Sequence, residues 1–123
     1  MATINIKTMG NLLTVSVTGD LDAKEVIAIV EEYYPNGIVK DVIWNLTNGS
    51  MSTISTQGFK EIANVTLKTV ASRARQGGRT VFVGNNSAEF GLMRMYAVIA
   101  EMAGVSIKYT VFKSMEEALQ WLE

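Results

Sequence analysis

The chain has 123 residues, a formal net charge of −1 and 48% hydrophobic residues. That length suits one domain that buries a hydrophobic core without disulfides or metal ions, and the charge gives no overall attraction to nucleic acid or anionic lipid. Cys and His are both absent, which excludes thiolate nucleophiles, disulfides, His-dependent catalytic triads and metal sites built on Cys or His. We therefore expect a single domain over residues 1–123, with no catalytic residues, no metal and no cofactor.

Two stretches of the chain bear on its location in the cell. The N-terminal stretch MATINIKTMG lacks the basic segment and the following apolar segment of a secretory signal. The apolar run MYAVIA, residues 95–100, is far too short to span a bilayer. We therefore expect a cytoplasmic protein that does not insert stably into a membrane and does not bind nucleic acid.

The first third of the chain predicts a β-hairpin followed by a helix. Residues 2–9 and 12–19 are rich in β-branched residues, and the Gly-Asn reversal between them favours antiparallel pairing. Asp22 and Glu25 then form an acidic variant of the capping box, and apolar residues recur at helical spacing behind them. We expect this helix over residues 22–34.

Strands and helices alternate through the rest of the chain. Residues 39–46, VKDVIWNL, are apolar at successive positions, which is typical of a strand buried on both faces. The elements expected after it are a helix over 59–76, a strand over 79–84, a helix over 88–104, a strand over 105–112 and a helix over 115–123. The order β-β-α-β-α-β-α-β-α predicts an α/β fold with a single-layer mixed sheet, parallel after an N-terminal antiparallel hairpin.

Two short motifs and the C-terminal region carry a resemblance to a known family. The turn GDLD, residues 19–22, stands before the first helix, where STAS domains carry a Gly-Glu-Leu-Asp-like turn. The stretch STQGF, residues 55–59, stands after a strand, where that family carries an Asp-Ser-Ser-Gly-Leu regulatory turn. Residues 90–122 look like the tail of the small bacterial SpoIIAA-like proteins, also grouped as STAS/SEC14-like. The chain thus resembles the STAS domain of anti-sigma-factor antagonists, which implies a SpoIIAA-like fold and a regulatory role.

The regulatory turn of that family is only partly kept. Ser55 replaces the Asp, Thr56 replaces the phosphorylatable Ser, Gln57 replaces the next Ser, and Gly58 is identical. A phosphate on Thr56 would face the free N–H groups and the positive dipole end of the following helix. Ser and Thr are also preferred helix N-caps, and either Ser55 or Thr56 suits that role. Two interpretations remain: a plain helix cap, or a vestigial phosphorylation switch at Thr56 or Ser55.

The helix expected over residues 88–104 is apolar nearly all round. Between positions 90 and 103 its only charged residues are Arg94 and Glu101, which lie seven positions apart on one narrow stripe. A helix that covers one side of a sheet needs an apolar stripe on only part of its circumference, so we expect a further cover for this one. The candidate surface comprises Phe90, Leu92, Met93, Met95, Tyr96, Ile99 and Met102.

Four covers for this helix are open at the level of the sequence. They are a second copy of the chain, a different protein, a small apolar or lipid-like molecule, and the neighbouring helices of the same domain. The methionines suit an adaptable surface. A two-fold homodimer is the commonest closed assembly of soluble proteins.

A polar loop precedes the same helix. Asn85, Asn86 and Ser87 follow a strand, at the position where ligands bind in open α/β sheets. The loop lacks the glycines and the Lys of a phosphate-binding motif, and Asn86 with Glu89 suits a helix cap instead. We expect it to share one edge of the sheet with the loop within residues 45–53 and with the regulatory turn.

These observations favour a non-enzymatic regulatory or scaffolding module that binds a protein partner and forms a homodimer. The alternative is a carrier or sensor of a small apolar or lipid-like ligand. The first interpretation rests on the resemblance and on the apolar helix, and the second on the apolar helix alone.

Overall fold

A single five-stranded mixed sheet organises the chain in the computed structural model, which describes residues 2–123. The strands are β1 (Thr3–Met9), β2 (Leu12–Asp20), β3 (Asp41–Ser50), β4 (Arg79–Val83) and β5 (Lys108–Phe112). They lie in the order β1-β2-β3-β4-β5, with β1 antiparallel to β2 and every later pair parallel. The α/β fold with an N-terminal antiparallel hairpin, predicted from the sequence, is confirmed.

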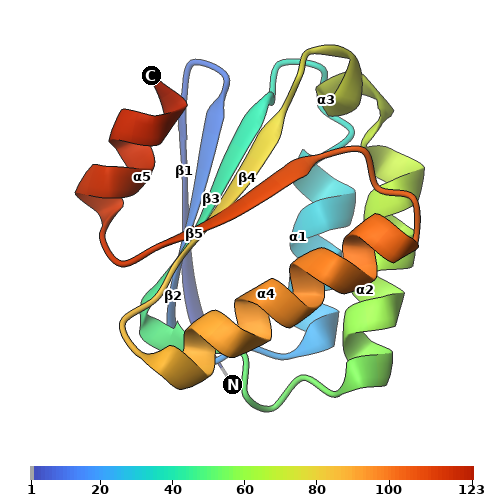
Figure 1. The fold of residues 1–123 in the computed structure, drawn as a ribbon. Helices are drawn as coiled ribbons and strands as arrows, with labels where there is room; N and C mark the ends of the chain where they lie inside the picture. Colours follow the sequence, from blue (N-terminus) through green and yellow to red (C-terminus); the bar gives the residue numbers. More distant parts are fainter. Residues whose placement is uncertain (1) are drawn as a thin grey trace.

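The helices divide unequally between the two faces of the sheet. They are α1 (Ala23–Tyr33), α2 (Thr56–Thr69), α3 (Ala71–Arg75), α4 (Ser87–Met102) and α5 (Met115–Leu122). Helices α1, α2 and α4 lie on one face, which we call the inner face, and α5 lies on the opposite, outer face (Figure 1). The large hydrophobic core therefore lies between the sheet and three helices.

The predicted continuous helix over residues 59–76 is wrong in one respect, because it is broken at Val70. Val70 caps the end of α2 and the start of α3, and its φ of −94° and ψ of −7° depart from regular helix values within the right-handed helical region. Just before it, the hydroxyls of Thr66 and Thr69 donate to carbonyls one turn earlier, at 2.8 and 3.2 Å. Such bonds compete with the helix ladder and bend it. Helix α2 therefore ends at Thr69, and a separate short α3 follows.

Two strand boundaries also differ from the predictions. The strand expected over residues 39–46 begins at Asp41 and continues to Ser50, because the last residues of β2 pair with it beyond a register shift. The strand expected over residues 105–112 begins only at Lys108. The segment before it is used instead to close α4, since Val105 donates its backbone N–H to the Ala100 carbonyl at 3.0 Å.

Alternate residues of the central strands build the inner core. Val15 of β2, Trp44 of β3 and Phe82 of β4 all face the helices and are buried. The Trp44 indole Nε1 donates to the Tyr34 hydroxyl at 3.0 Å, so the buried indole is satisfied. The ring of Tyr96 on α4 meets Phe82 edge-on at 6.0 Å between ring centroids. Aromatic contacts thus join α4 to the centre of the sheet.

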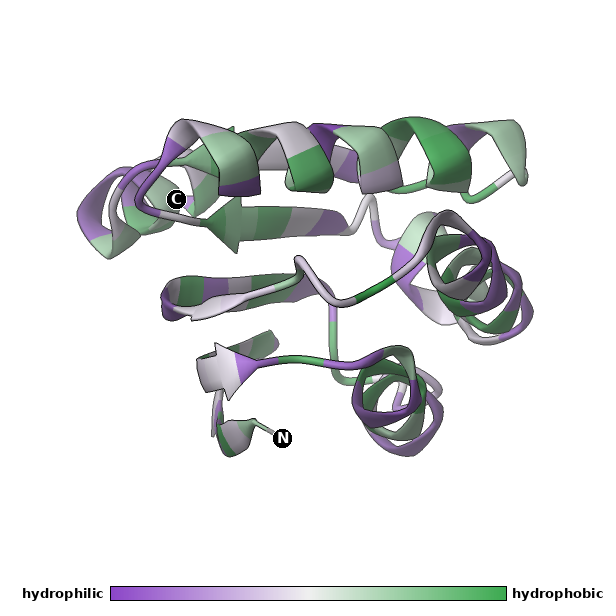
Figure 2. Cartoon of the chain, turned by 90° about the horizontal axis from the view of Figure 1, so that it is seen from below, coloured by the Kyte–Doolittle hydropathy of each residue, from purple (hydrophilic) through white to green (hydrophobic). Residues whose placement is uncertain are grey.

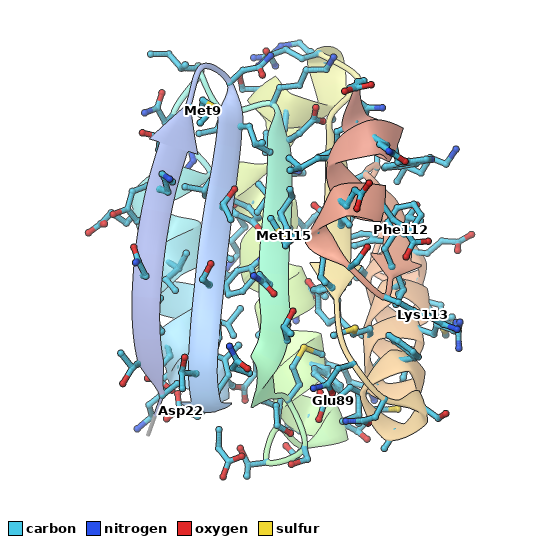
Figure 3. The ribbon with its side chains drawn as sticks, turned by 90° about the vertical axis from the view of Figure 1, so that its left-hand side faces the viewer. Met9, Asp22, Glu89, Phe112, Lys113 and Met115 are labelled. Atoms are coloured by element: carbon cyan, nitrogen blue, oxygen red, sulfur yellow. The ribbon has the colours of Figure 1, made fainter. Side chains whose placement is uncertain are left out.

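The outer core is smaller and covers only part of its face. Ile43, Val81 and Val83 pack against Ala118 of α5. Figure 3 shows α5 over the β4–β5 side, while β1 and β2 lie open. Arg79 fastens the end of this helix, because its guanidinium donates to the last carbonyls of α5 at 3.2 and 2.9 Å.

Candidate functional site

Three segments of the chain meet at the carboxyl end of the parallel strands. Asp22 and Glu89 lie at one end of the sheet and Met9 lies at the other (Figure 3). The GDLD turn bonds to the end of β3, since Leu21 donates its backbone N–H to the Ser50 carbonyl at 2.9 Å. The GDLD turn therefore contacts the end of β3, from which the chain leads through residues 51–54 to the STQGF stretch.

Hydrogen bonds tie the loop after β3 and the loop after β4 to this edge. The Thr53 hydroxyl donates to the Leu21 carbonyl at 3.2 Å. The Asn85 side-chain amide donates to the Thr47 carbonyl at 2.8 Å. The structure thus brings the GDLD turn, the β3–α2 loop and the start of α4 to one edge of the sheet.

The hydroxyls of the STQGF stretch have different surroundings. Ser55 is the N-cap of α2, and its Oγ accepts the Gly58 backbone N–H at 3.0 Å. Thr56 is the first residue of α2; it is exposed, and its hydroxyl makes no side-chain hydrogen bond within residues 2–123. The cap belongs to Ser55, which leaves the Thr56 hydroxyl free.

Gly58 allows α2 to approach the start of α1. A Cβ at this position would lie 3.0 Å from Ile54 Cγ2 and 3.3 Å from the Ala23 Cβ. Both distances are tighter than ordinary van der Waals contact, so a larger residue would push the two helices apart. The glycine shared with the regulatory turn of STAS domains therefore has a packing role in this chain.

Glu89 makes contacts at this edge that the sequence did not predict. Only 6% of it is exposed. Its carboxylate accepts the Ser50 hydroxyl and, at 3.1 Å, the Met51 backbone N–H. Ser50 Oγ in turn lies 2.9 Å from the Ser52 Oγ. A carboxylate from α4 is thus linked through one hydroxyl to the loop that precedes the STQGF stretch.

The sequence had assigned Glu89 to a helix cap. The cap exists, because Asn86 Oδ1 accepts the Glu89 backbone N–H at 2.9 Å. The Glu89 side chain, however, does not return to the cap but reaches across to β3. An acid at the third position of a helix is so common that nothing local indicates this long-range contact.

A polar hollow lies beside these contacts. Its volume is about 410 Å³, and it is lined by Gly19, Asp20, Thr47, Asn48, Gly49, Ser50, Asn85 and Asn86. The predicted loop residues Asn85 and Asn86 therefore border one concavity, and the exposed Ser87 begins α4 next to it. Among residues 2–123, no group of three or more acidic side chains is arranged to hold a metal ion.

The apolar residues of α4 fall into three groups. Met93 and Tyr96 are buried in the inner core, so the domain itself covers them. Phe90, Leu92 and Ile99 are partly buried at its margin. The exposed members are Met95 at 36%, Val98 at 54% and Met102 at 83%. Some residues of the predicted partner surface thus belong to the hydrophobic core, while others form a stripe that faces solvent.

A small cavity lies in the inner core between the sheet and the helices. Its volume is about 30 Å³, room for about two water molecules. Its walls are mostly apolar, with the phenols of Tyr34, Tyr96 and Tyr109 among them. Burial raises the pKa of Tyr96 to about 12 and also raises the pKa of Tyr34 and Tyr109, so all three hydroxyls are neutral donors at pH 7.

Arg73 of α3 adds a buried positive charge next to this cavity. The side chain is fully buried, and its guanidinium lies 4.8 Å from the centroid of the Tyr34 ring. It donates to the carbonyls of Lys40 and Arg79 and to the Thr80 hydroxyl, at 2.8 to 2.9 Å. Its Nη1 has no hydrogen-bond partner within residues 2–123.

Comparison with solved structures identifies the architecture. SpoIIAA, an anti-sigma factor antagonist, matches in its unphosphorylated form with a TM-score of 0.59 and 13% identity over 98% of this chain and 97% of that one. An anti-sigma factor antagonist from Mycobacterium paratuberculosis matches with a TM-score of 0.61 and 12% identity over 98% and 93%. The chain has a SpoIIAA-like STAS fold.

A third structure with this fold is similar over nearly the whole chain. It is a protein of the DUF3478 family from Shewanella loihica, with a TM-score of 0.55 and 18% identity over 99% of this chain and 93% of that one. Neither a protein-family model nor a curated protein matches the sequence. Within residues 2–123, no helix combines the length and the apolar character needed to cross a membrane. The SpoIIAA-like fold implied by the resemblance is confirmed.

Proposed function

We propose that this SpoIIAA-like domain is a non-enzymatic regulatory module that binds a protein partner at the carboxyl edge of its sheet and is switched by phosphorylation of Thr56. The observation that carries the proposal is the exposed, unbonded Thr56 hydroxyl at the first position of α2. Two of the similar structures are anti-sigma factor antagonists, and SpoIIAA is also known in a phosphorylated form, which matches with a TM-score of 0.56. Both facts support a regulatory protein-binding role.

The surroundings of Thr56 suit a switch that leaves the fold intact. A phosphate there meets the unpaired backbone N–H groups and the positive dipole end of α2, so it adds about two negative charges without burying them. The cap made by Ser55 is unaffected, because it uses a different side chain. The added charge therefore changes the surface that a partner meets more than it changes the stability of the domain.

The test uses intact-mass measurement and partner capture with matched variants. Protein purified from its own host is expected to carry one phosphate under some growth condition, lost in Thr56→Val and kept in Ser55→Ala. Quantitative capture with wild type and Thr56→Glu as baits is expected to differ about tenfold or more for the partner, whereas Thr56→Val is expected to behave like the unphosphorylated wild type. Absence of phosphate under every condition, with equal capture by all baits, would contradict the proposal.

A second candidate function is carriage of a small apolar ligand in the inner cavity. The mostly apolar walls of the cavity support this alternative, although its volume of about 30 Å³ is far below the roughly 300 Å³ of ordinary ligand pockets, so it admits only a very small molecule. Xenon is a suitable probe, because it is apolar and small. Under xenon pressure, the indole N–H resonance of Trp44, which lines the cavity, is expected to shift, while that of Trp121 on the outer face serves as the control and stays unchanged. Equal responses of the two indoles would rule the candidate out.

A further inference from the structure

The outward side of α4 carries one continuous exposed stripe. Its members, which we call the α4 stripe, are Gly91, Arg94, Met95, Val98, Glu101 and Met102, all of them exposed. Their spacing of three and four residues places them along one side of the helix. Figure 2 shows α4 along an outer side of the molecule, with no other element beyond it. The stripe is therefore free to meet another surface.

The charges of the α4 stripe are self-complementary about its centre. Arg94 lies four positions before Val98, and Glu101 lies three positions after it. In a second copy related by a two-fold axis near Val98, the two α4 helices run antiparallel. Each Arg94 then faces the Glu101 of the other copy. In a parallel arrangement like charges would face each other, so the pattern selects the antiparallel one.

Neither charge has a counter-ion within its own domain. Arg94 and Glu101 form no salt bridge within residues 2–123, where the one ion pair joins Arg79 and Asp41. Seven positions correspond to about 10 Å along a helix, too far for Arg94 and Glu101 of one copy to pair. Arg94 instead lies over the Phe90 ring, 5.9 Å from its centroid. Both side chains are thus available to a second copy.

A hollow beside the α4 stripe can receive side chains from that copy. It has a volume of about 320 Å³ and is lined by Arg94, Ala97, Val98, Tyr109, Thr110 and Val111. It lies between α4 and β5, which is an edge strand with one side unpaired. Exposed methionines such as Met102 are flexible enough to fill an irregular apolar hollow. The stripe thus offers both projecting side chains and a place to put them.

We propose that a second copy of this chain covers the α4 stripe, in a two-fold dimer whose antiparallel α4 helices pair Arg94 of each copy with Glu101 of the other. The proposal rests on the self-association predicted from the sequence. It does not involve Thr56, which lies on the carboxyl edge at the start of α2.

Charge exchange tests this arrangement directly. Wild type is expected to be a dimer by light scattering coupled to size-exclusion chromatography. Arg94→Glu makes both positions acidic and Glu101→Arg makes both basic, so each variant alone is expected to dissociate, with the dimer weakened at least tenfold. An equimolar mixture of the two is expected to form a heterodimer, and the double variant is expected to dimerise again. Glu116→Arg, an exposed charge reversal on α5, is the control and stays dimeric.

Several results would overturn the proposal. If the wild type remains monomeric at its highest soluble concentration, a second copy of the chain does not cover the α4 stripe. If Arg94→Glu and Glu101→Arg both remain dimeric, the dimer interface does not include the α4 stripe. Dissociated variants that fail to combine on mixing, while circular dichroism shows them folded, exclude the antiparallel pairing. None of these results affects the Thr56 test, because partner capture and phosphate mass are measured independently of the oligomeric state.

Discussion

The two faces of the sheet bury similar kinds of residue but are protected very differently. Three helices cover the inner face, and its core includes an aromatic cluster around Phe59, Phe82, Tyr96 and Tyr109. Among the elements of residues 2–123, only α5 covers the outer face; it spans eight residues and packs over β3, β4 and β5. Residues such as Thr14 and Ser16 on β2 stay partly solvated on that face. We infer that the inner face holds most of the stability, while α5 is a locally attached cover.

The side chains of the strands explain this inequality. In β3, Val42 and Trp44 face inward while Ile43 faces outward, and all three are buried. In β2, by contrast, Leu12 packs against the outer cluster, but the outward Thr14 and Ser16 are polar and gain little from a covering helix. A short helix placed over β3–β5 therefore covers the apolar side chains of the central strands on this face.

The largest expected effect comes from the same truncation made on each face. Phe82→Ala removes a ring that is 5% exposed in the inner core, so we expect the free energy of unfolding to fall by about 3–5 kcal/mol. Phe112→Ala removes a half-buried ring on the outer face, which packs against Trp121 at 5.9 Å, and we expect a loss of about 1–2 kcal/mol. Urea unfolding followed by circular dichroism measures both.

Equal losses in the two variants would show that α5 is as integral to the fold as the inner helices. A matched m-value is needed for the comparison, because a variant that alters the unfolded state changes the slope as well as the midpoint. With equal slopes, the difference between the two variants reports the difference between the faces.

Alkaline pH is expected to destabilise the inner face more than the outer face. Burial raises the pKa of Tyr96 from 10.0 to about 12, so the folded state favours the neutral phenol. This contribution to stability is fully present below pH 10 and is lost as the pH rises from about 10 to 12. Burial shifts the pKa of Tyr34 and Tyr109 in the same direction. All three lie on the inner face, so its packing is expected to weaken first as the pH rises.

The measurement is the urea midpoint of wild type and Tyr96→Phe at several values between pH 8 and about 11. The Phe variant is expected to show a smaller loss of stability over that interval, because one of the buried phenols is gone. A parallel decline in both proteins would mean that Tyr96 contributes nothing to the alkaline transition.

The features predicted correctly from the sequence are those set by local spacing. The capping box of α1 forms as expected, with bonds of 3.0 and 2.8 Å between Asp22 and Glu25. The strands were predicted from their apolar patterns, and the order of the elements was predicted from the positions of the strands. The GDLD turn and the STQGF stretch were placed at the right elements, and their position at one edge of the sheet follows from the parallel order of β2 and β3.

What the sequence missed depends on long-range contacts. Glu89 has the local signature of a cap residue, and only the folded chain brings its carboxylate to Ser50. Helix α4 is apolar nearly all round, but which of its residues are core depends on its position at the β5 side of the sheet. Met93 and Met95 are two positions apart and chemically identical, yet one is fully buried and the other is exposed. No local pattern distinguishes them.

The smallest expected effect compares the caps of one helix on each face. Ser55 caps α2 at 3.0 Å and Ser114 caps α5 at 3.2 Å, and loss of such a cap typically costs about 1 kcal/mol. Helix α2 is part of the inner core, so Ser55→Ala is expected to lower global stability by about that amount. Helix α5 can open locally, so Ser114→Ala is expected to appear mainly as faster amide exchange within α5, with about half as large a change in the urea midpoint. If Ser114→Ala instead speeds exchange in β3 and α2 as much as in α5, the outer helix unfolds only together with the whole domain. The two faces would then differ in how much apolar surface they bury, and not in whether their helices can open separately.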